Sequence, residues 1–203
     1  MNAGPADNRV LTVPNALSGL RLALIPLFVY VLLGAHADGW AAAILMVGGA
    51  SDWADGKIAR LMNQSSRLGE LLDPAVDRLY MVTVPVTVAV AGLVPWWIVV
   101  LMLARDGLLA ATLPLLRSRG LSALPVTYAG KAATFALMSA FPLILVGEGE
   151  ASWNRVLLSC GWGFLIWGLY LYLWALAVYA VQVILVARRM PRLGAAHAAG
   201  GDG

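Results

Sequence analysis

Charge is what this chain lacks most. Only 12% of its 203 residues are Asp, Glu, Lys or Arg, whereas soluble domains carry about 25%. Hydrophobic residues make up 61% of the chain, and the mean hydropathy is +0.79. Such a composition requires lipid as the solvent and excludes an ordinary soluble domain.

Other absences narrow the function further. The single cysteine, Cys160, excludes an intrachain disulfide. The net charge is only +3, and no run of Lys and Arg is interleaved with aromatic residues, so nucleic-acid binding is excluded. The segment Met1–Pro14 has no apolar stretch followed by a small-residue cleavage site, and we expect no removable signal peptide.

What the chain does have is a series of long apolar stretches. A membrane-spanning helix needs about 20 mainly apolar residues, and six stretches approach or exceed that length. They predict an all-α fold, an integral membrane bundle of six transmembrane helices at Leu17–Leu33, Trp40–Leu61, Leu71–Ala91, Trp96–Leu116, Gly130–Val146 and Val156–Ala187. We expect one membrane domain over residues 1–193 and a disordered Gly- and Ala-rich tail over 194–203.

The basic residues predict how the bundle is oriented. One set of connections and ends is rich in cations, namely Arg9, Lys57, Arg60, Arg67, Arg117, Arg119, Arg188, Arg189 and Arg192. The opposite set has Asp38, Glu148 and Glu150, with Arg155 as its basic residue. Because cytoplasmic loops carry the excess of Lys and Arg, we predict a multi-pass protein of the cell membrane with both termini in the cytoplasm.

Four aspartates form the main candidate site. Ionisable residues within spanning segments are costly and mark functional sites. Asp52 and Asp55 are three residues apart on one predicted helix, and Asp73 and Asp77 are four apart on the next, so each pair shares a helix face. Four carboxylates in a partly dry cavity need cations to offset their repulsion. Oxygen ligands point to Mg²⁺, Mn²⁺ or Ca²⁺ rather than zinc, and a two-metal site would suit phosphoryl transfer.

Small and basic residues lie beside these aspartates. Gly56, Ala59 and Gly69 are on the same predicted faces, where small side chains let a bulky ligand approach. Lys57 and Arg60 provide cations for a phosphate. The combination indicates a pyrophosphate site. The glycines could instead serve helix packing, and Lys57 could be a membrane anchor.

Two other classes of protein also use membrane aspartates. An intramembrane prenyltransferase would be expected to carry two separate Asp-rich motifs on a longer chain. A divalent-cation transporter would favour acidic residues near the bilayer midplane and an internal repeat. This chain has one cluster, near one membrane face, and no evident repeat.

The spacing of the cluster resembles the signature of the CDP-alcohol phosphotransferases. The matching positions are Asp52, Asp55, Gly56, Ala59, Arg60, Gly69, Asp73 and Asp77, at the family's offsets. Pro14, Asn15 and Arg21 in and before the first span are also similar to the family, as are six spans and cytoplasmic termini.

The resemblance implies a reaction and roles for these residues. Members are homodimeric six-helix enzymes with a polar cavity open to the cytoplasm, and they transfer the phosphatidyl group of CDP-diacylglycerol to an alcohol with release of CMP. Asp52, Asp55 and Asp73 would hold Mg²⁺ or Mn²⁺, with Asp77 also near the metals and acting as the base. Gly56, Ala59, Arg60 and Gly69 would line the nucleotide and pyrophosphate.

The acceptor alcohol is predicted from two basic residues in the later spans. Arg105, followed by Asp106, and Lys131 resemble acceptor-binding residues of the phosphatidylglycerophosphate and cardiolipin synthase branch. Glycerol-3-phosphate users of that branch carry a second lysine where this chain has Ala133. One fewer cation favours phosphatidylglycerol as the acceptor, which would give cardiolipin, and glycerol-3-phosphate is the alternative. Either residue could instead be structural, with Arg105 paired to Asp106 and Lys131 a membrane anchor.

Overall fold

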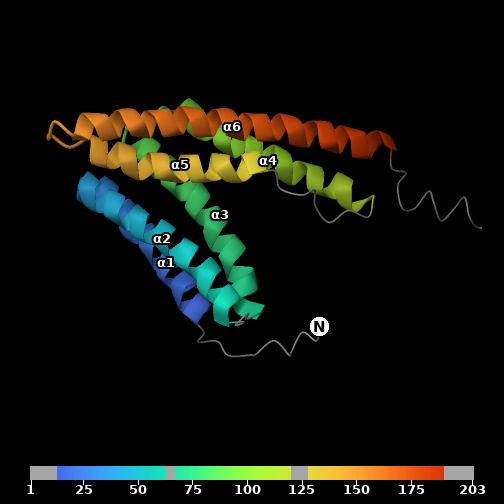
Figure 1. Ribbon diagram of the computed structural model, residues 1–203, viewed down its shortest axis with the longest axis horizontal. Coiled ribbons are helices and arrows are strands. Elements are labelled where there is room, and N and C mark those ends of the chain that lie inside the picture. The colour runs from blue at the N-terminus through green and yellow to red at the C-terminus, as the bar shows by residue number, and fades with distance from the viewer. Residues whose placement is uncertain (1–12, 63–66, 120–127, 190–203) are drawn as a thin grey trace, which may run out of the picture. The chain divides into compact units, whose positions relative to one another are not determined.

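A computed structural model describes residues 13–62, 67–119 and 128–189 of the chain. Side chains are described except at 13–17, 52–74 and 189. The described residues form helices and short connections, without strands (Figure 1). In chain order the helices are α1 (Val13–Val29), the π-helical segment η1 (Tyr30–Gly34), α2 (Asp38–Met62), α3 (Arg67–Val90), α4 (Trp96–Arg117), α5 (Tyr128–Gly147) and α6 (Asn154–Arg189).

The helices confirm the all-α prediction, and each α-helix overlaps one of the six apolar stretches, with η1 continuing the first. Within the described residues, three helices are long and apolar enough to cross a membrane, at Trp96–Arg117, Tyr128–Gly147 and Asn154–Arg188. Ser18–Gly34 is apolar but shorter. Six crossings therefore remain a prediction, and the tail at 194–203 lies outside the described residues.

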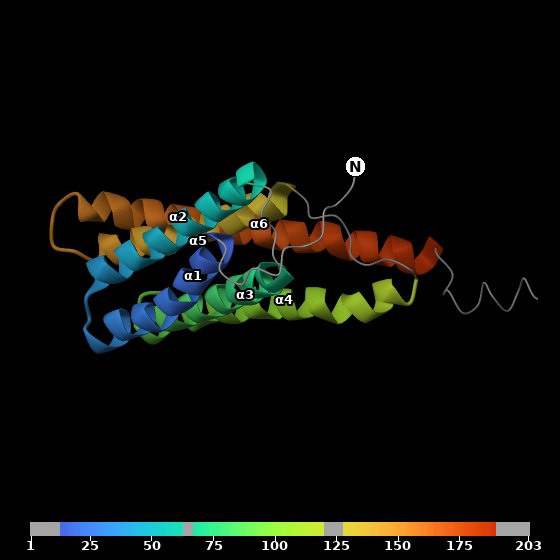
Figure 2. The same cartoon turned by 90° about the horizontal axis from the view of Figure 1, so that it is seen from below.

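The described helices fall into two compact units. The first lies within Met1–Trp96 and Met138–Gly163, and the second within Trp97–Leu137 and Phe164–Gly203. In the first unit α1 packs against both α2 and α3, and Figure 2 shows it running between them. Phe28 and Leu32 are buried in this unit, as are Ala41 and Ala42 at the start of α2.

Glycines bring α5 and α6 together as an antiparallel hairpin. A Cβ on Gly147 would lie 2.6 Å from the Cα of Leu158, and a Cβ on Gly161 would lie 2.9 Å from the backbone nitrogen of Ile144. Further along, in the second unit, Gly168 would meet the backbone nitrogen of Leu137 at 3.1 Å. Small residues at such positions allow the close backbone approach common between membrane helices.

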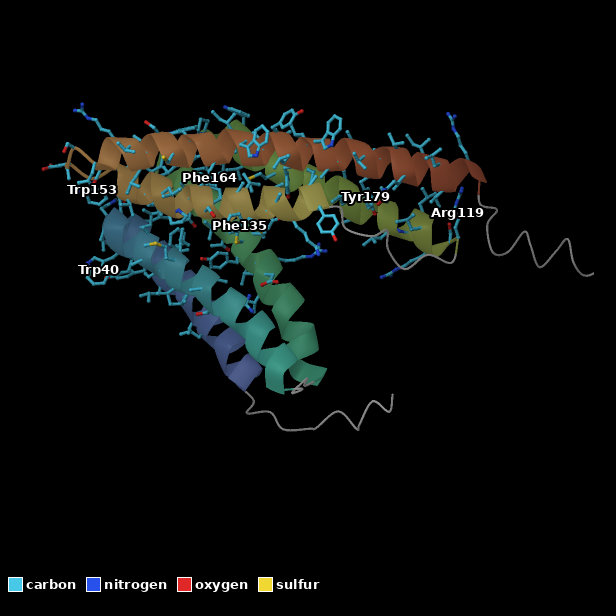
Figure 3. All side chains as sticks on the ribbon, viewed as in Figure 1. Trp40, Arg119, Phe135, Trp153, Phe164 and Tyr179 are labelled. Atoms are coloured by element: carbon cyan, nitrogen blue, oxygen red, sulfur yellow. The ribbon has the colours of Figure 1, made fainter. Side chains whose placement is uncertain are left out.

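The second unit pairs α4 with α6 in parallel. Three hydrogen bonds join them at nearly equal offsets along the two helices: Asp106 with Tyr172, Thr112 with Tyr179, and Arg119 with the carbonyl of Val186. α4 and α6 are parallel and α5 is antiparallel to α6, so these three successive helices alternate in direction. Figure 3 labels Tyr179 on α6 and Arg119 just beyond α4.

The outward side chains of α6 are large and apolar. Ile166, Trp167, Tyr170 and Trp174 are all more than half exposed, and such a surface would be unfavourable in water. Several threonine and serine hydroxyl groups donate to carbonyls of their own helix, as Thr134 does to the carbonyl of Gly130 at 2.9 Å. Backbone and hydroxyl groups satisfied inside the helix are what a lipid environment requires.

Candidate active site

Asp77 is held by an arginine from another helix. Arg21 on α1 donates from Nη1 to Oδ1 of Asp77 on α3, at 2.5 Å. The Arg21 side chain is 6% exposed, whereas that of Asp77 is 54% exposed. A buried guanidinium needs an anionic partner, so the ion pair fixes one carboxylate oxygen and leaves the group accessible from outside the protein.

Tyr80 joins α3 to the backbone of α2. Its hydroxyl donates to the carbonyl of Leu45 at 3.3 Å, and a Cβ on Gly48 would lie 2.9 Å from that hydroxyl oxygen. The glycine therefore lets the tyrosine reach the α2 backbone. The two helices run in opposite directions within the first unit (Figure 1). The contact lies about two helical turns from Asp52 along α2 and from Asp73 along α3.

Most of the predicted metal and nucleotide site is described only as helix backbone. Asp52, Asp55, Gly56, Ala59 and Arg60 belong to α2, and Gly69 and Asp73 to α3, but their side chains lie outside the described residues. Among the side chains described, no three acidic, His or Cys residues gather at one point. Convergence of the four aspartates therefore stays a prediction, and Asp77 is the one member whose side-chain contacts are known.

The two predicted acceptor residues both belong to the second unit. Arg105 on α4 donates from Nη1 to Oδ1 of its neighbour Asp106 at 2.9 Å, and its side chain is 16% exposed. Lys131 on α5 is exposed, with Nζ 6.0 Å from the centre of the Tyr128 ring. Arg105 is thus held in place, whereas Lys131 lies at the surface of the helix.

Ala133 does not share the face of Lys131. The two positions are about 200° apart around a helix, and Ala133 is fully buried while Lys131 is exposed. A lysine at position 133 would have to be buried, so it would not simply add a second cation beside Lys131. The choice of acceptor therefore needs support other than the number of lysines.

Tyr172 is a member of this region that the sequence did not indicate. Its hydroxyl donates to Oδ1 of Asp106 at 2.6 Å, and the Arg105 guanidinium carbon lies 4.1 Å from its ring centre. The residues around Tyr172 in the sequence are mostly apolar, and nothing in that segment distinguishes this tyrosine from the others. Only its position opposite α4 reveals the contact.

Taken separately, the two units each carry a group with a chemical use. Asp77 has a carboxylate that is anchored and accessible, which suits a base, and Arg105 has a fixed guanidinium, which suits a phosphate. Each is described within its own unit.

Comparison with known proteins defines the class. The chain belongs to the CDP-alcohol phosphatidyltransferase family, whose model matches residues 11–174. It is therefore a transferase, and the prenyltransferase and transporter alternatives are set aside.

Individual relatives extend the comparison. A protein of Mycobacterium tuberculosis with the provisional name cardiolipin synthase is 69% identical over 94% of this chain and 92% of its own length. The Streptomyces coelicolor "Cardiolipin synthase (CMP-forming)" is 44% identical over 89% of this chain and 86% of its own. An Arabidopsis thaliana CDP-diacylglycerol–glycerol-3-phosphate 3-phosphatidyltransferase is 31% identical over 87% of this chain and 64% of its own length.

Proposed function

We propose that this protein transfers the phosphatidyl group of CDP-diacylglycerol to phosphatidylglycerol, forming cardiolipin and releasing CMP. The observation that carries the proposal is 44% identity over 89% of the chain to a relative named as a CMP-forming cardiolipin synthase. Glycerol-3-phosphate is the second candidate acceptor, because a relative named for that reaction is 31% identical over a similar share. The higher identity favours phosphatidylglycerol.

The proposed metal site consists of Asp52, Asp55, Asp73 and Asp77. Their oxygen ligands fit Mg²⁺ or Mn²⁺, and the hydrogen bond of Tyr80 to the carbonyl of Leu45 joins the two helices that carry them. The accessible Asp77 carboxylate also fits such a site. When bound, one or two divalent ions would neutralise charge developing on the diphosphate.

The chain's own residues then divide the remaining work. Asp77 accepts the proton of the acceptor hydroxyl, while Arg21 holds its carboxylate in one orientation. The hydroxyl oxygen bonds to the phosphorus that carries diacylglycerol, and the bond from that phosphorus to the CMP oxygen breaks, so CMP leaves with the electron pair. Gly56, Ala59, Arg60 and Gly69 line the nucleotide and pyrophosphate.

Arg105 and Lys131 bind the phosphate of the acceptor in this proposal. The guanidinium of Arg105 is already immobilised by its neighbours, which lowers the entropy lost on binding. Lys131 is an exposed point charge at the start of α5. A diester with a single charge can be bound by these two cations.

The architecture proposed for this reaction is a homodimer with six spans per chain. A polar cavity opens to the cytoplasm, and both termini lie on that side of the cell membrane. The alternating directions of α4, α5 and α6 support three successive crossings.

An acceptor panel tests the proposed reaction. Purified protein in mixed micelles would receive labelled CDP-diacylglycerol with phosphatidylglycerol, glycerol-3-phosphate, serine or inositol phosphate, and the products would be identified by mass. We expect cardiolipin and CMP in equal amounts, and turnover of glycerol-3-phosphate at least about tenfold slower. Faster conversion of glycerol-3-phosphate would replace the proposed acceptor with the second candidate.

A chelator arm belongs to the same experiment. We expect EDTA to stop CMP release and added Mg²⁺ or Mn²⁺ to restore it, since the carboxylate site cannot neutralise the diphosphate alone. Full activity in EDTA would contradict the metal assignment.

A further inference from the structure

Three polar side chains form a connected group between the otherwise apolar helices α4 and α6. Arg105 Nη1 donates to Asp106 Oδ1 at 2.9 Å, and the Tyr172 hydroxyl donates to the same oxygen at 2.6 Å. The Arg105 guanidinium carbon also lies 4.1 Å from the Tyr172 ring centre. All three residues belong to the second unit.

Tyr172 therefore touches Arg105 in two ways. Its ring face attracts the guanidinium directly, and its hydroxyl holds the carboxylate that binds Nη1. The tyrosine is 6% exposed, so packing on α6 keeps it in place. A cation restrained at its face and at one end has little freedom to rotate.

These contacts use the face and Nη1 of the guanidinium, and they leave its Nε edge for another ligand. Arg105 Nε is buried and has no hydrogen-bond partner among the described residues. A buried donor without a partner is unfavourable, and an anion on that edge would satisfy it. The Nε edge of a guanidinium is well suited to binding phosphate oxygens in pairs.

We propose that Tyr172 is a positioning residue for the acceptor, acting through Asp106 and Arg105 to present the Nε edge of Arg105 to the acceptor phosphate. The proposal rests on the role of Arg105 given under the proposed function. It adds a specific requirement, namely that the hydroxyl of Tyr172 matters even when its ring is kept.

Tyr179 provides a matched control. It lies two turns further along α6, and its hydroxyl is 3.2 Å from that of Thr112 on α4. Removing this hydroxyl makes the same chemical change at the same pair of helices, away from Arg105. Effects of Tyr172→Phe that Tyr179→Phe shares would reflect helix packing alone.

The experiment measures kcat and KM for both substrates in wild type, Tyr172→Phe and Tyr179→Phe. We expect Tyr172→Phe to raise KM for phosphatidylglycerol about five- to tenfold, the loss of one hydrogen bond to a charged group, with KM for CDP-diacylglycerol unchanged. Tyr179→Phe should leave both values within about twofold. Unchanged acceptor KM in Tyr172→Phe, or equal changes for both substrates, would overturn the proposal.

A double-mutant cycle separates positioning from simple structure. In an Arg105→Gln background the acceptor KM is already raised, and adding Tyr172→Phe should change it little, because the tyrosine acts through the arginine. Independent, multiplicative effects would show that Tyr172 acts by another route. Thermal unfolding of each variant in the same detergent identifies any variant that has lost its fold. If Tyr172→Phe is such a variant, Tyr172→His supplies a second substitution that keeps a ring and a hydrogen-bond donor. We expect Tyr172→His to retain part of the affinity for the acceptor.

The outcome is separable from that of the acceptor panel. If the panel shows that glycerol-3-phosphate, not phosphatidylglycerol, is the preferred acceptor, the proposed function is wrong about the acceptor. The same kinetic comparison is then made with glycerol-3-phosphate, whose phosphate Arg105 would bind, and the Tyr172 proposal stands or falls on that KM.

Discussion

At the scale of single residues, the ion pair between Arg21 and Asp77 is the best-described part of the proposed active site. It joins a buried cation on α1 to a half-exposed acid on α3. Such a pair contributes less to stability than its short distance suggests, because the buried charge loses hydration. Its more important effect is to orient a carboxylate that remains accessible to substrate.

Asp77→Asn tests whether that carboxylate acts as the base. Asparagine keeps an oxygen that can accept from Arg21, so packing is little disturbed, but it cannot take a proton. We expect turnover to fall by about 10²- to 10⁴-fold, the usual contribution of a general base, while metal-dependent nucleotide binding is largely kept. Steady-state CMP release and equilibrium binding of a labelled CDP-alcohol measure the two effects.

Glu150→Gln is the control for this prediction. Glu150 is an exposed acid in the connection between α5 and α6, and its loss should leave turnover unchanged. Near-normal turnover in Asp77→Asn would remove Asp77 from the base role.

At the scale of helices, the α5–α6 hairpin depends on glycines that no side chain can replace without movement. Gly161 is the clearest case, because a Cβ there would lie 2.8 Å from Cγ1 of Ile144 and 2.9 Å from its backbone nitrogen. Two residues along the same helix, Gly163 has no atom within 4 Å of the corresponding point. Substitutions at these two glycines therefore separate the effect of helix packing on stability from the effect of helix propensity.

Gly161→Ala should destabilise the protein although alanine favours helices. The added methyl group meets backbone, and forcing helices apart typically costs about 1–3 kcal/mol. Gly163→Ala should be neutral or stabilising by up to about 1 kcal/mol, since it gains helix propensity without a clash. Unfolding in mixed micelles followed by tryptophan fluorescence gives both values, and equal stabilities of the two variants would contradict the packing argument.

At the scale of the whole molecule, the direction of the helices links the fold to the membrane. α4 and α6 are parallel, and α5 runs against α6. If α4, α5 and α6 each cross the bilayer, Ser118 after α4 and Ser152 before α6 must lie on opposite sides. The positive residues Arg117 and Arg119 predict that the Ser118 side lies in the cytoplasm.

Cysteine labelling tests this orientation. Both serines are exposed, and replacing the exposed Cys160 by serine removes the native thiol. In that background an impermeant maleimide should label Ser152→Cys in intact cells, and Ser118→Cys only after permeabilisation. Labelling of both from outside would contradict three crossings, and the reverse pattern would invert the proposed topology.

The sequence alone was sufficient for the helices and for the family. The helices were predictable because an apolar stretch of membrane length has few alternatives to a helix, and α5 and α6 appeared within a few residues of the expected bounds. The family followed from the eight-position signature, since fixed spacing of acids on two helices is specific, and the match over residues 11–174 confirmed it.

Contacts between helices required the tertiary structure. Hydropathy shows that a helix is buried in lipid but not which face meets which neighbour, and α6 is apolar on all sides. The pairing of Arg21 with Asp77, the reach of Tyr172 to Asp106 and the burial of Ala133 all depend on helix rotation and alignment. Thus the sequence by itself determined which segments are helices and which reaction class they serve, because both follow from local composition and spacing. Only the tertiary structure decided how the charged side chains are held, because that depends on packing between segments far apart in the chain.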